Sequence, residues 1–265
     1  VDLTTGAATA LGVIGGDEIL RGLAVASQVA LQSNFYAVTT GDNLVRFNGA
    51  NPGLVTSPLT ISGLQSGETI LGIDTRPATG QLYALGSSSR LYRVDPTTGV
   101  ATQVGSGPFA TPLSGTAFGF DFNPVVDRIR VVSNNGQNLR LHPDTGAVAG
   151  VDTTLTPGAP QVVAAAYTDN FSGTTTTTLY VINAVSDTLQ LQGGLNSAPS
   201  PNGGVLTNVG NLGVDFNGEV GFDIATENGI AFAALNPTGT VTSRLYVVDL
   251  TTGAATALGV IGGDE

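Results

Sequence analysis

Residues 116–148 read TAFGFDFNPVVDRIRVVSNNGQNLRLHPDTGAV and contain three short runs in which apolar and polar side chains alternate. Short alternating runs bounded by Asn, Pro and Gly are typical of half-buried β-strands joined by tight turns. In the sequence HPDTG, Gly146 stands where a hairpin turn needs a positive φ angle. The stretch therefore predicts consecutive antiparallel strands.

The same pattern recurs five times along the chain. Each unit has a first strand rich in small residues, two alternating strands, and a weaker fourth strand after a turn such as DPTTG or DLTTG. Four strands in each of five units predict an all-β fold, a five-bladed β-propeller with four antiparallel strands per blade. The blades are expected to start near Glu18, Glu68, Thr116, Gln161 and Glu219.

One position of the first strand is occupied only by Gly or Ala in all five units. The first strands of a propeller converge on a narrow axis, where bulky side chains would collide. We therefore expect axial packing at this position. Its residues are Gly22, Gly72, Gly119, Ala165 and Gly221.

The composition excludes several classes of partner and site. All nine basic residues are Arg, against twenty acidic residues, and the net charge is −11. Nucleic acid and anionic membranes are unsuitable partners, because binding phosphate needs a basic surface. Without cysteine there is no disulfide framework and no thiolate metal site. No apolar run is long enough to span a membrane, and no cofactor is predicted.

The segment VDLTTGAATALGVIGGDE occurs twice, at residues 1–18 and 248–265. Residues 1–16 have the pattern of an outer-strand segment, and residues 248–263 have the same pattern at the end of a single propeller formed by residues 17–265. Two identical segments cannot occupy the same place in one fold. The residues expected to mediate assembly are Val1, Asp2, Leu3, Ala8, Leu11, Val13, Val248, Leu250, Ala255, Leu258 and Val260.

The duplication is compatible with two kinds of assembly. Modules can follow one another covalently in a tandem array, or a terminal strand can add to the open sheet edge of a neighbouring chain. The overlap is equally explained if this sequence is one piece of a longer repetitive protein, divided at a point that leaves the same segment at both ends. The leading hypothesis is a non-enzymatic structural module of an extracellular filament, matrix fibre or bacterial surface stalk, whose partners are copies of itself. Adhesion through variable loops to an unidentified surface glycan or other partner stays open.

Three aspartates fall at equivalent positions, two residues after the axial glycine: Asp74, Asp121 and Asp223. The other two units have Ala24 and Tyr167 there. Carboxylates around one channel can bind a hard cation such as calcium, or act as the acid and the nucleophile or base of a glycoside hydrolase. The alternative is that each aspartate accepts N–H hydrogen bonds from the backbone of a turn or an adjoining blade. The expectation is that the chain is not an enzyme.

Other polar residues carry weaker signals. His142 is the only histidine and stands in a turn, which argues against a histidine-based zinc site or a Ser-His-Asp triad. Arg76 and Asn123 follow the aspartates and suggest either a ligand at the channel mouth or polar stabilisation of a Pro-containing turn. The segment SAPSPNGG, residues 197–204, predicts a surface loop.

Four segments resemble the DUF4394 family: GIDTRPATGQLYAL at residues 72–85, AFGFDFNPVVDRIRVVSNNGQNLRLHPDTGAV at 117–148, AAAYTDNFSGTTTTTLYVI at 164–182 and LGVDFNGEVGFDI at 212–224. The resemblance implies a propeller-like bacterial domain, mostly secreted or at the cell surface, of unassigned function. It implies no catalytic residues. The exact duplication of the chain ends departs from an ordinary single-domain member.

Overall fold

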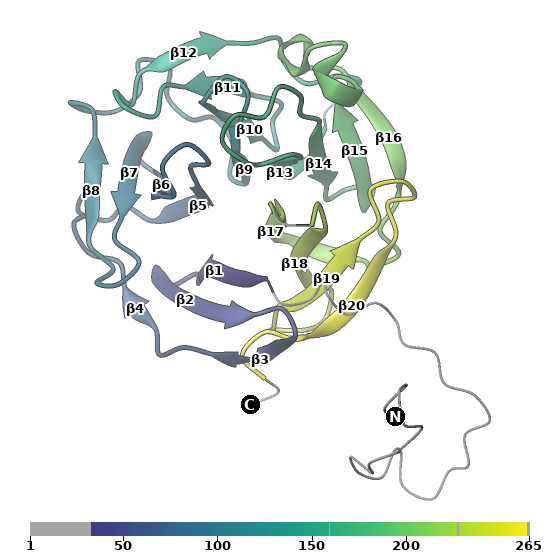
Figure 1. Cartoon of the computed structure of the whole chain (residues 1–265), viewed down its shortest axis with the longest axis horizontal. Coiled ribbons are helices and arrows are strands. Elements are labelled where there is room, and N and C mark those ends of the chain that lie inside the picture. Colours follow the sequence, from purple (N-terminus) through teal and green to yellow (C-terminus); the bar gives the residue numbers. More distant parts are fainter. Residues whose placement is uncertain (1–32, 159, 227, 264–265) are drawn as a thin grey trace, which may run out of the picture.

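A computed structural model describes residues 33–158, 160–226 and 228–263, and in it five four-stranded antiparallel sheets surround a central axis (Figure 1). The predicted five-bladed β-propeller is therefore confirmed. The described residues contain two short 3-10 turns, and no helix among them is long and apolar enough to cross a membrane.

The last four blades each run from the axis outward in chain order. Blade two consists of β5 (Ile70–Thr75), β6 (Leu82–Gly86), β7 (Arg90–Val94) and β8 (Ala101–Val104). Blade three consists of β9 (Phe118–Asn123), β10 (Arg128–Ser133), β11 (Asn138–Leu141) and β12 (Val148–Val151). Blade four consists of β13 (Val162–Tyr167), β14 (Leu179–Asn183), β15 (Thr188–Gln192) and β16 (Leu206–Asn211). Blade five consists of β17 (Phe216–Ile224), β18 (Ala231–Pro237), β19 (Arg244–Val248) and β20 (Ala255–Val260).

Blade one differs from the other blades in how its four strands pair. They are β1 (Asn34–Val38), β2 (Asn43–Asn48), β3 (Asn51–Val55) and β4 (Leu59–Thr60), and both β3 and β4 pair with β2. The expected fourth strand is thus divided in two, because the β2–β3 register shifts after Phe47 and Pro52 cannot donate to the ladder. The expected first strand near Glu18, with Gly22, lies outside the described residues.

The turns between third and fourth strands follow the sequence closely. Gly99, Gly146 and Gly253 have φ angles of 75°, 66° and 81°, as their positions in DPTTG, HPDTG and DLTTG predict. In two of these turns an aspartate side chain accepts backbone N–H groups two or three residues later, at Asp95 and Asp249. These Asx turns fix the register of the outer hairpins.

Backbone hydrogen bonds join neighbouring blades at the rim. The N–H of Ser62 donates to the carbonyl of Gly99 at 3.1 Å, and the N–H of Thr156 donates to Gly204 at 2.8 Å. The ring closes where Gly262 N–H donates to the Pro52 carbonyl at 3.1 Å, joining blade five to blade one. Deeper in the same seam, the rings of Phe35 and Phe232 meet edge to face at 4.9 Å. The first and last described blades therefore pack directly on each other.

The inner strands approach closely at two of the predicted axial positions. A Cβ atom on Gly72 would lie 2.8 Å from the Cβ of Phe120, and one on Gly119 would lie 2.7 Å from the Cβ of Ala165. Both contacts cross from one blade to the next, so these positions require a small residue. Among the described residues, a Cβ atom on Gly221 would lie nearest to Ala234 of its own blade, at an ordinary 3.5 Å. The expected first strand of blade one, which would be the next strand around the axis, lies outside the described residues, so crowding at Gly221 stays a prediction.

The second copy of the duplicated segment, residues 248–263, completes the fifth blade. Val248 ends β19 and is buried, while Ala255, Leu258 and Val260 lie half-buried on β20, the outermost strand (Figure 1). Leu250, in the turn between them, packs against the core shared by blades four and five. The expected assembly residues of the first copy, Val1, Asp2, Leu3, Ala8, Leu11 and Val13, lie outside the described residues.

Candidate functional site

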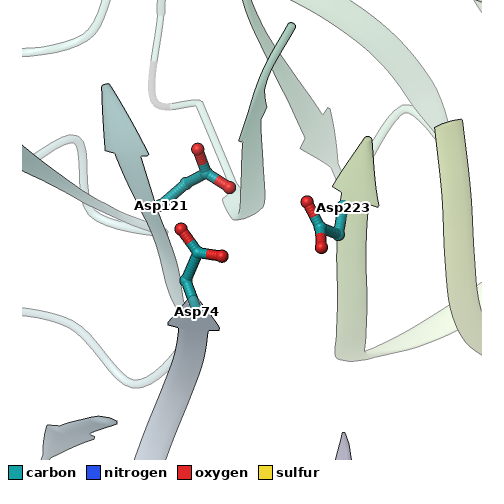
Figure 2. Close-up of side chains that lie close together, drawn as sticks. All are labelled: Asp74, Asp121 and Asp223. Carbon is teal, nitrogen blue, oxygen red and sulfur yellow. The ribbon is translucent and has the colours of Figure 1, made fainter. Parts of the chain in front are cut away.

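Three inner strands bring Asp74, Asp121 and Asp223 together near the propeller axis (Figure 2). Asp74 lies on β5, Asp121 on β9 and Asp223 on β17, and one carboxylate oxygen of each lies within 4.8 Å of the others. The three aspartates, which stand at equivalent positions of the repeated first strand, therefore lie close together in space. We call these three residues the axial carboxylates.

Backbone amides hold the axial carboxylates in place. Asp74 accepts the Phe122 N–H of the adjoining blade at 2.7 Å, and Asp121 accepts the Tyr167 N–H of the next blade at 3.0 Å. Asp223 accepts the N–H of Ile224, its own neighbour, at 2.7 Å. The alternative in which each aspartate accepts a backbone N–H is therefore found, and the three carboxylates converge as well, while cation binding by them stays a prediction.

Burial and like charge act together on two of these groups. Asp74 is 7% exposed and Asp121 is 1% exposed, whereas Asp223 is exposed. Burial, followed by repulsion from Asp223, raises the pKa of Asp74 well above its usual value. Burial, followed by repulsion from Asp74 and Asp223, raises the pKa of Asp121 well above its usual value. The arrangement therefore favours uptake of a proton or of a cation.

The donor set suits a hard cation. Calcium binds oxygen ligands, including carboxylates, and needs about six to eight of them, of which this cluster supplies a part. Carboxyl groups of glycoside hydrolases stand about 5 to 5.5 Å apart in retaining enzymes and about 6.5 to 9.5 Å apart in inverting ones. The oxygens of the axial carboxylates lie within 4.8 Å of one another, and all three carboxylates accept backbone N–H groups, so the cluster fits the wide spacing of an inverting enzyme poorly.

A second polar site lies between blades three and four and was not predicted from the sequence. It is a hollow of about 440 Å³ that we call the arginine hollow. Its walls come from the β9–β10 turn, strands β10 and β11, the β13–β14 loop and the loop before β16. The lining residues are Asn123, Val125, Val126, Arg128, Arg130, Arg140, Tyr167, Thr175, Thr176, Thr177, Asn196, Ser197, Ser200, Pro201 and Asn202.

Arg130 forms the buried floor of the arginine hollow and is 2% exposed. Its guanidinium donates to Asp152 at 2.6 Å, to the Asn138 side chain at 2.7 Å and to Asn202 Oδ1 at 2.6 Å. The Tyr167 hydroxyl accepts from its Nε at 3.3 Å. Four acceptors from four parts of the chain therefore fix a buried cation in one orientation.

Asp152 is shared by two arginines that face each other across the β10–β11 pair. Arg130 and Arg140 are cross-strand partners, and Asp152 accepts from both, including two hydrogen bonds of 2.8 Å from Arg140. Burial alone would raise the pKa of Asp152, but the hydrogen bonds from Arg140 and Arg130 outweigh it and lower the pKa. Asp152 is therefore held as a carboxylate between two positively charged guanidinium groups.

The segment at residues 197–204, expected to be a surface loop, forms a wall of the hollow. It includes the 3-10 turn η3 (Pro201–Gly203), which follows another short turn, η2 (Leu195–Ser197). The Pro201 carbonyl accepts from Gln192 Nε2 at 2.9 Å and from Asn138 Nδ2 at 3.3 Å. These inward contacts anchor the loop to blades three and four, which the Pro- and Gly-rich sequence did not reveal.

Residues 43–265 match a known family, described as a domain of unknown function, DUF4394. The chain belongs to the DUF4394 family. The match covers blades two to five and most of the described part of blade one. A comparison with curated proteins gives no match.

Solved structures similar to this DUF4394 chain share low sequence identity. One is PorZ of Porphyromonas gingivalis, described as an essential bacterial surface component of the type-IX secretion system, with 16% identity and a TM-score of 0.42. The alignment covers 83% of this chain but only 27% of the PorZ structure. YCF48 from Cyanidioschyzon merolae has 12% identity and a TM-score of 0.40, with 84% of this chain and 68% of that chain covered. A protein from Lactobacillus plantarum has 19% identity and a TM-score of 0.43, with 87% and 68% covered.

Other polar residues of this DUF4394 chain have structural partners. Arg76 is buried and pairs with Asp127 at 2.5 Å and Asp144 at 2.6 Å, which lie in the next blade. Asn123 Oδ1 accepts the N–H groups of Val125 and Val126 and so stabilises the Pro-containing turn. His142 Nδ1 accepts the N–H of Asp144 within its own turn.

Proposed function

We propose that this chain is a non-enzymatic structural module, a propeller that is repeated or joined by strands into an extracellular filament, matrix fibre or bacterial surface stalk. The observation that carries the proposal is the role of residues 248–263. They include β20, the outer strand of blade five, and Gly262, which contacts blade one at the rim, while an identical segment stands at residues 1–16. One propeller has one such place, so the other copy suits the fifth blade of a second module.

The period of the duplication supports a close connection between modules. The second copy starts 247 residues after the first, so Glu265 corresponds to Glu18, where the first strand of blade one is expected. A following module would begin directly after the Gly262-Gly263 pair that touches blade one. Successive propellers would then be joined without a separate linker, and the partner of each module would be another copy of itself.

The composition supports a place outside the cell. The chain has no Cys or Met, the side chains most readily oxidised, and its net charge of −11 favours solubility. Because surface fibres are exposed to oxidants and to variable salt, such a composition suits them.

The proposal is tested by electron microscopy of the native material, together with light scattering of residues 1–265 and of a variant that lacks residues 1–16. A covalent array predicts beaded fibres in the native material, with monomers for both purified chains. Strand exchange predicts concentration-dependent oligomers of the full chain that the deletion abolishes. Isolated single propellers in the native material, combined with a monomeric full chain at every concentration, would contradict both forms of assembly.

A second function, cation binding by the axial carboxylates, is favoured by their mutual approach within 4.8 Å. Calcium would relieve the repulsion that raises the pKa of Asp74 and Asp121, and it would link three blades. We expect about 1 mM calcium, a concentration at which extracellular modules bind, to raise the Tm of the protein. The Asp121→Asn variant should lose most of this increase. An equal increase in the variant, or none in the parent chain, would contradict cation binding.

A further inference from the structure

The arginine hollow collects positive charge in an acidic protein. Three of the nine arginines of the chain line it, and none of its fifteen lining residues is acidic. Asp152 offsets one of these charges through its pairs with Arg130 and Arg140. For Arg128 no ion pair is recorded within the described part of the chain. The hollow therefore presents a net positive charge where the remaining protein repels anions.

Two of the three arginines keep donors available. Arg140 uses Nε and Nη2 for Asp152, and among the described residues its Nη1 has no acceptor. Arg128 donates from Nη1 to the carbonyls of Val126 and Asp127, while its Nε and Nη2 have no acceptor within the described ranges. The planar donor geometry of a guanidinium matches a carboxylate in two parallel hydrogen bonds.

The remaining lining suits a ligand rich in hydroxyl groups. Threonine and serine hydroxyls and asparagine amides make up most of it, and each can donate to or accept from a sugar hydroxyl. A volume of about 440 Å³ lies within the range of about 300 to 1,000 Å³ that small-molecule sites occupy. An inorganic anion alone would leave most of this space and most of these polar groups unused.

We propose that the arginine hollow binds a carboxylate-bearing sugar, such as a uronic acid unit of an acidic polysaccharide. The carboxylate lies against Arg128 and Arg140, and the ring hydroxyls meet the amides and hydroxyls of the two loops. Arg130 serves as a fixed floor, because its hydrogen bonds to Asn138, Asp152, Tyr167 and Asn202 hold it in place. The site does not depend on assembly of the propellers.

A second hollow on the same molecule provides a matched control. It is lined by Arg93 and Asp95 together with residues of β6 to β8, so its charges balance. Arg93 is exposed, and Arg128 and Arg140 are partly exposed. Substitution of Arg93 removes the same charge from the protein without touching the arginine hollow.

The test is a calorimetric titration of the full chain with glucuronate, with glucose as its neutral counterpart and with sulfate as a simple anion. We expect saturable binding of glucuronate, and about tenfold or more weaker binding of both glucose and sulfate, the loss expected for a missing charge-assisted hydrogen bond. Absence of saturable glucuronate binding would overturn the proposal. Equal binding of sulfate would overturn the sugar assignment, and equal binding of glucose would overturn the role of the carboxylate.

Three variants locate the binding. Arg140→Gln leaves Asp152 paired with Arg130, and Arg128→Gln removes bonds only to two carbonyls of its own turn, so both are expected to fold. Each should weaken glucuronate binding about tenfold. Arg93→Gln should leave it unchanged. An equal loss in all three variants would mean a general effect of charge and would overturn the assignment to this hollow.

Discussion

The axial carboxylates and the arginine hollow are adjacent and are built in opposite ways. In the axial cluster, Asp74 and Asp121 are buried beside like charge, and no ion pair to either is recorded within the described residues. In the hollow, buried Arg130 has the carboxylate of Asp152 and three neutral acceptors. The first site gains stability from a proton or cation, whereas the second is already balanced at its floor and open to an anion at its rim.

The two sites meet at Tyr167. Its backbone N–H donates to Asp121, and its hydroxyl accepts from Arg130 Nε. Asp121 and Arg130 are also cross-strand partners on β9 and β10, yet the guanidinium extends to Asp152 on the outer side of the blade. Asp121 and Arg130 therefore do not form an ion pair with each other, although their strand positions are directly opposite. Their separation leaves the axial carboxylates and the rim arginines of the hollow unpaired with each other, as the proposed cation and carboxylate ligands require.

The largest effect is expected from removing the carboxylate of the balanced site. Asp152→Asn leaves Arg130, at 2% exposure, without its charged partner and leaves Arg140 opposite it across the strands. Loss of one partner of a buried ion pair costs about 3 to 5 kcal/mol of unfolding free energy. Denaturation in urea measures this loss.

Asp144→Asn is the matched control for that experiment. Asp144 also pairs with a buried arginine, Arg76, but its side chain is 58% exposed and Arg76 retains Asp127. An exposed pair contributes about 1 kcal/mol or less. If the two substitutions cost the same, burial would not be what distinguishes Asp152.

The next effect concerns the spacing between the two sites. Gly119→Ala places a Cβ 2.7 Å from both the Cβ and the backbone N of Ala165, which forces β9 away from β13. Overpacking of this kind costs about 1 to 3 kcal/mol. The same movement would lengthen the hydrogen bond from Tyr167 to Asp121.

Gly221→Ala tests whether every axial glycine is required for stability or only those with a close neighbour. Among the described residues its new Cβ would lie nearest to Ala234, at an ordinary 3.5 Å, so we expect these contacts to leave the unfolding free energy the same or to raise it by about 0.4 to 1 kcal/mol through a less flexible unfolded chain. Thermal denaturation of both variants gives the comparison. Equal destabilisation would mean that all axial positions are crowded alike.

The fold and the axial cluster were within reach of the sequence because both follow from repetition. Equivalent positions in repeated strands must occupy equivalent places around the axis, so Asp74, Asp121 and Asp223 had to converge. The N–H groups that Asp74 and Asp121 accept from the adjoining blades also match the alternative drawn from the sequence, whereas the depth of burial of these two side chains was not predicted. The divided outer strand of blade one was likewise hidden, since one register shift at Phe47 decides it.

The arginine hollow was out of reach because its parts are unrelated by the repeat. Arg130 and Asn202 stand 72 residues apart and meet only because the loop of blade four folds onto blade three. One signal was present in the sequence. Arg128 and Arg130 alternate in one strand and Arg140 falls in the next, so two arginines were bound to face each other and to need a shared anion.

A smaller effect of opposite sign is expected at the axis. Because the pKa of Asp121 is raised in the folded protein, its contribution to stability is complete at low pH and is lost as the pH rises through that pKa. Asp121→Asn should therefore stabilise the cation-free protein near neutral pH. The advantage should shrink as the pH falls to about 4.

Asp95→Asn provides the reverse case. The N–H of Thr97 lowers the pKa of Asp95, so the stability that this carboxylate contributes is present above the usual aspartate pKa and is lost on acidification. The variant should be the less stable protein at neutral pH, and the difference should close as the pH falls. Parallel pH profiles for the two variants would contradict the distinction between a repelled and a hydrogen-bonded carboxylate.

Another modest effect is expected at Tyr167, the residue that the two sites share. Tyr167→Phe removes the hydroxyl that accepts from Arg130 at 3.3 Å but keeps the backbone N–H that Asp121 accepts. We expect a loss of about 0.5 to 1.5 kcal/mol in unfolding free energy, toward the lower end because the hydrogen bond is long. The pH dependence attributed to Asp121 should be unchanged, since its own contacts remain. If that pH dependence moves with the hydroxyl, the two charged sites are coupled through Tyr167, and binding of an anion in the hollow would alter the cation affinity at the axis.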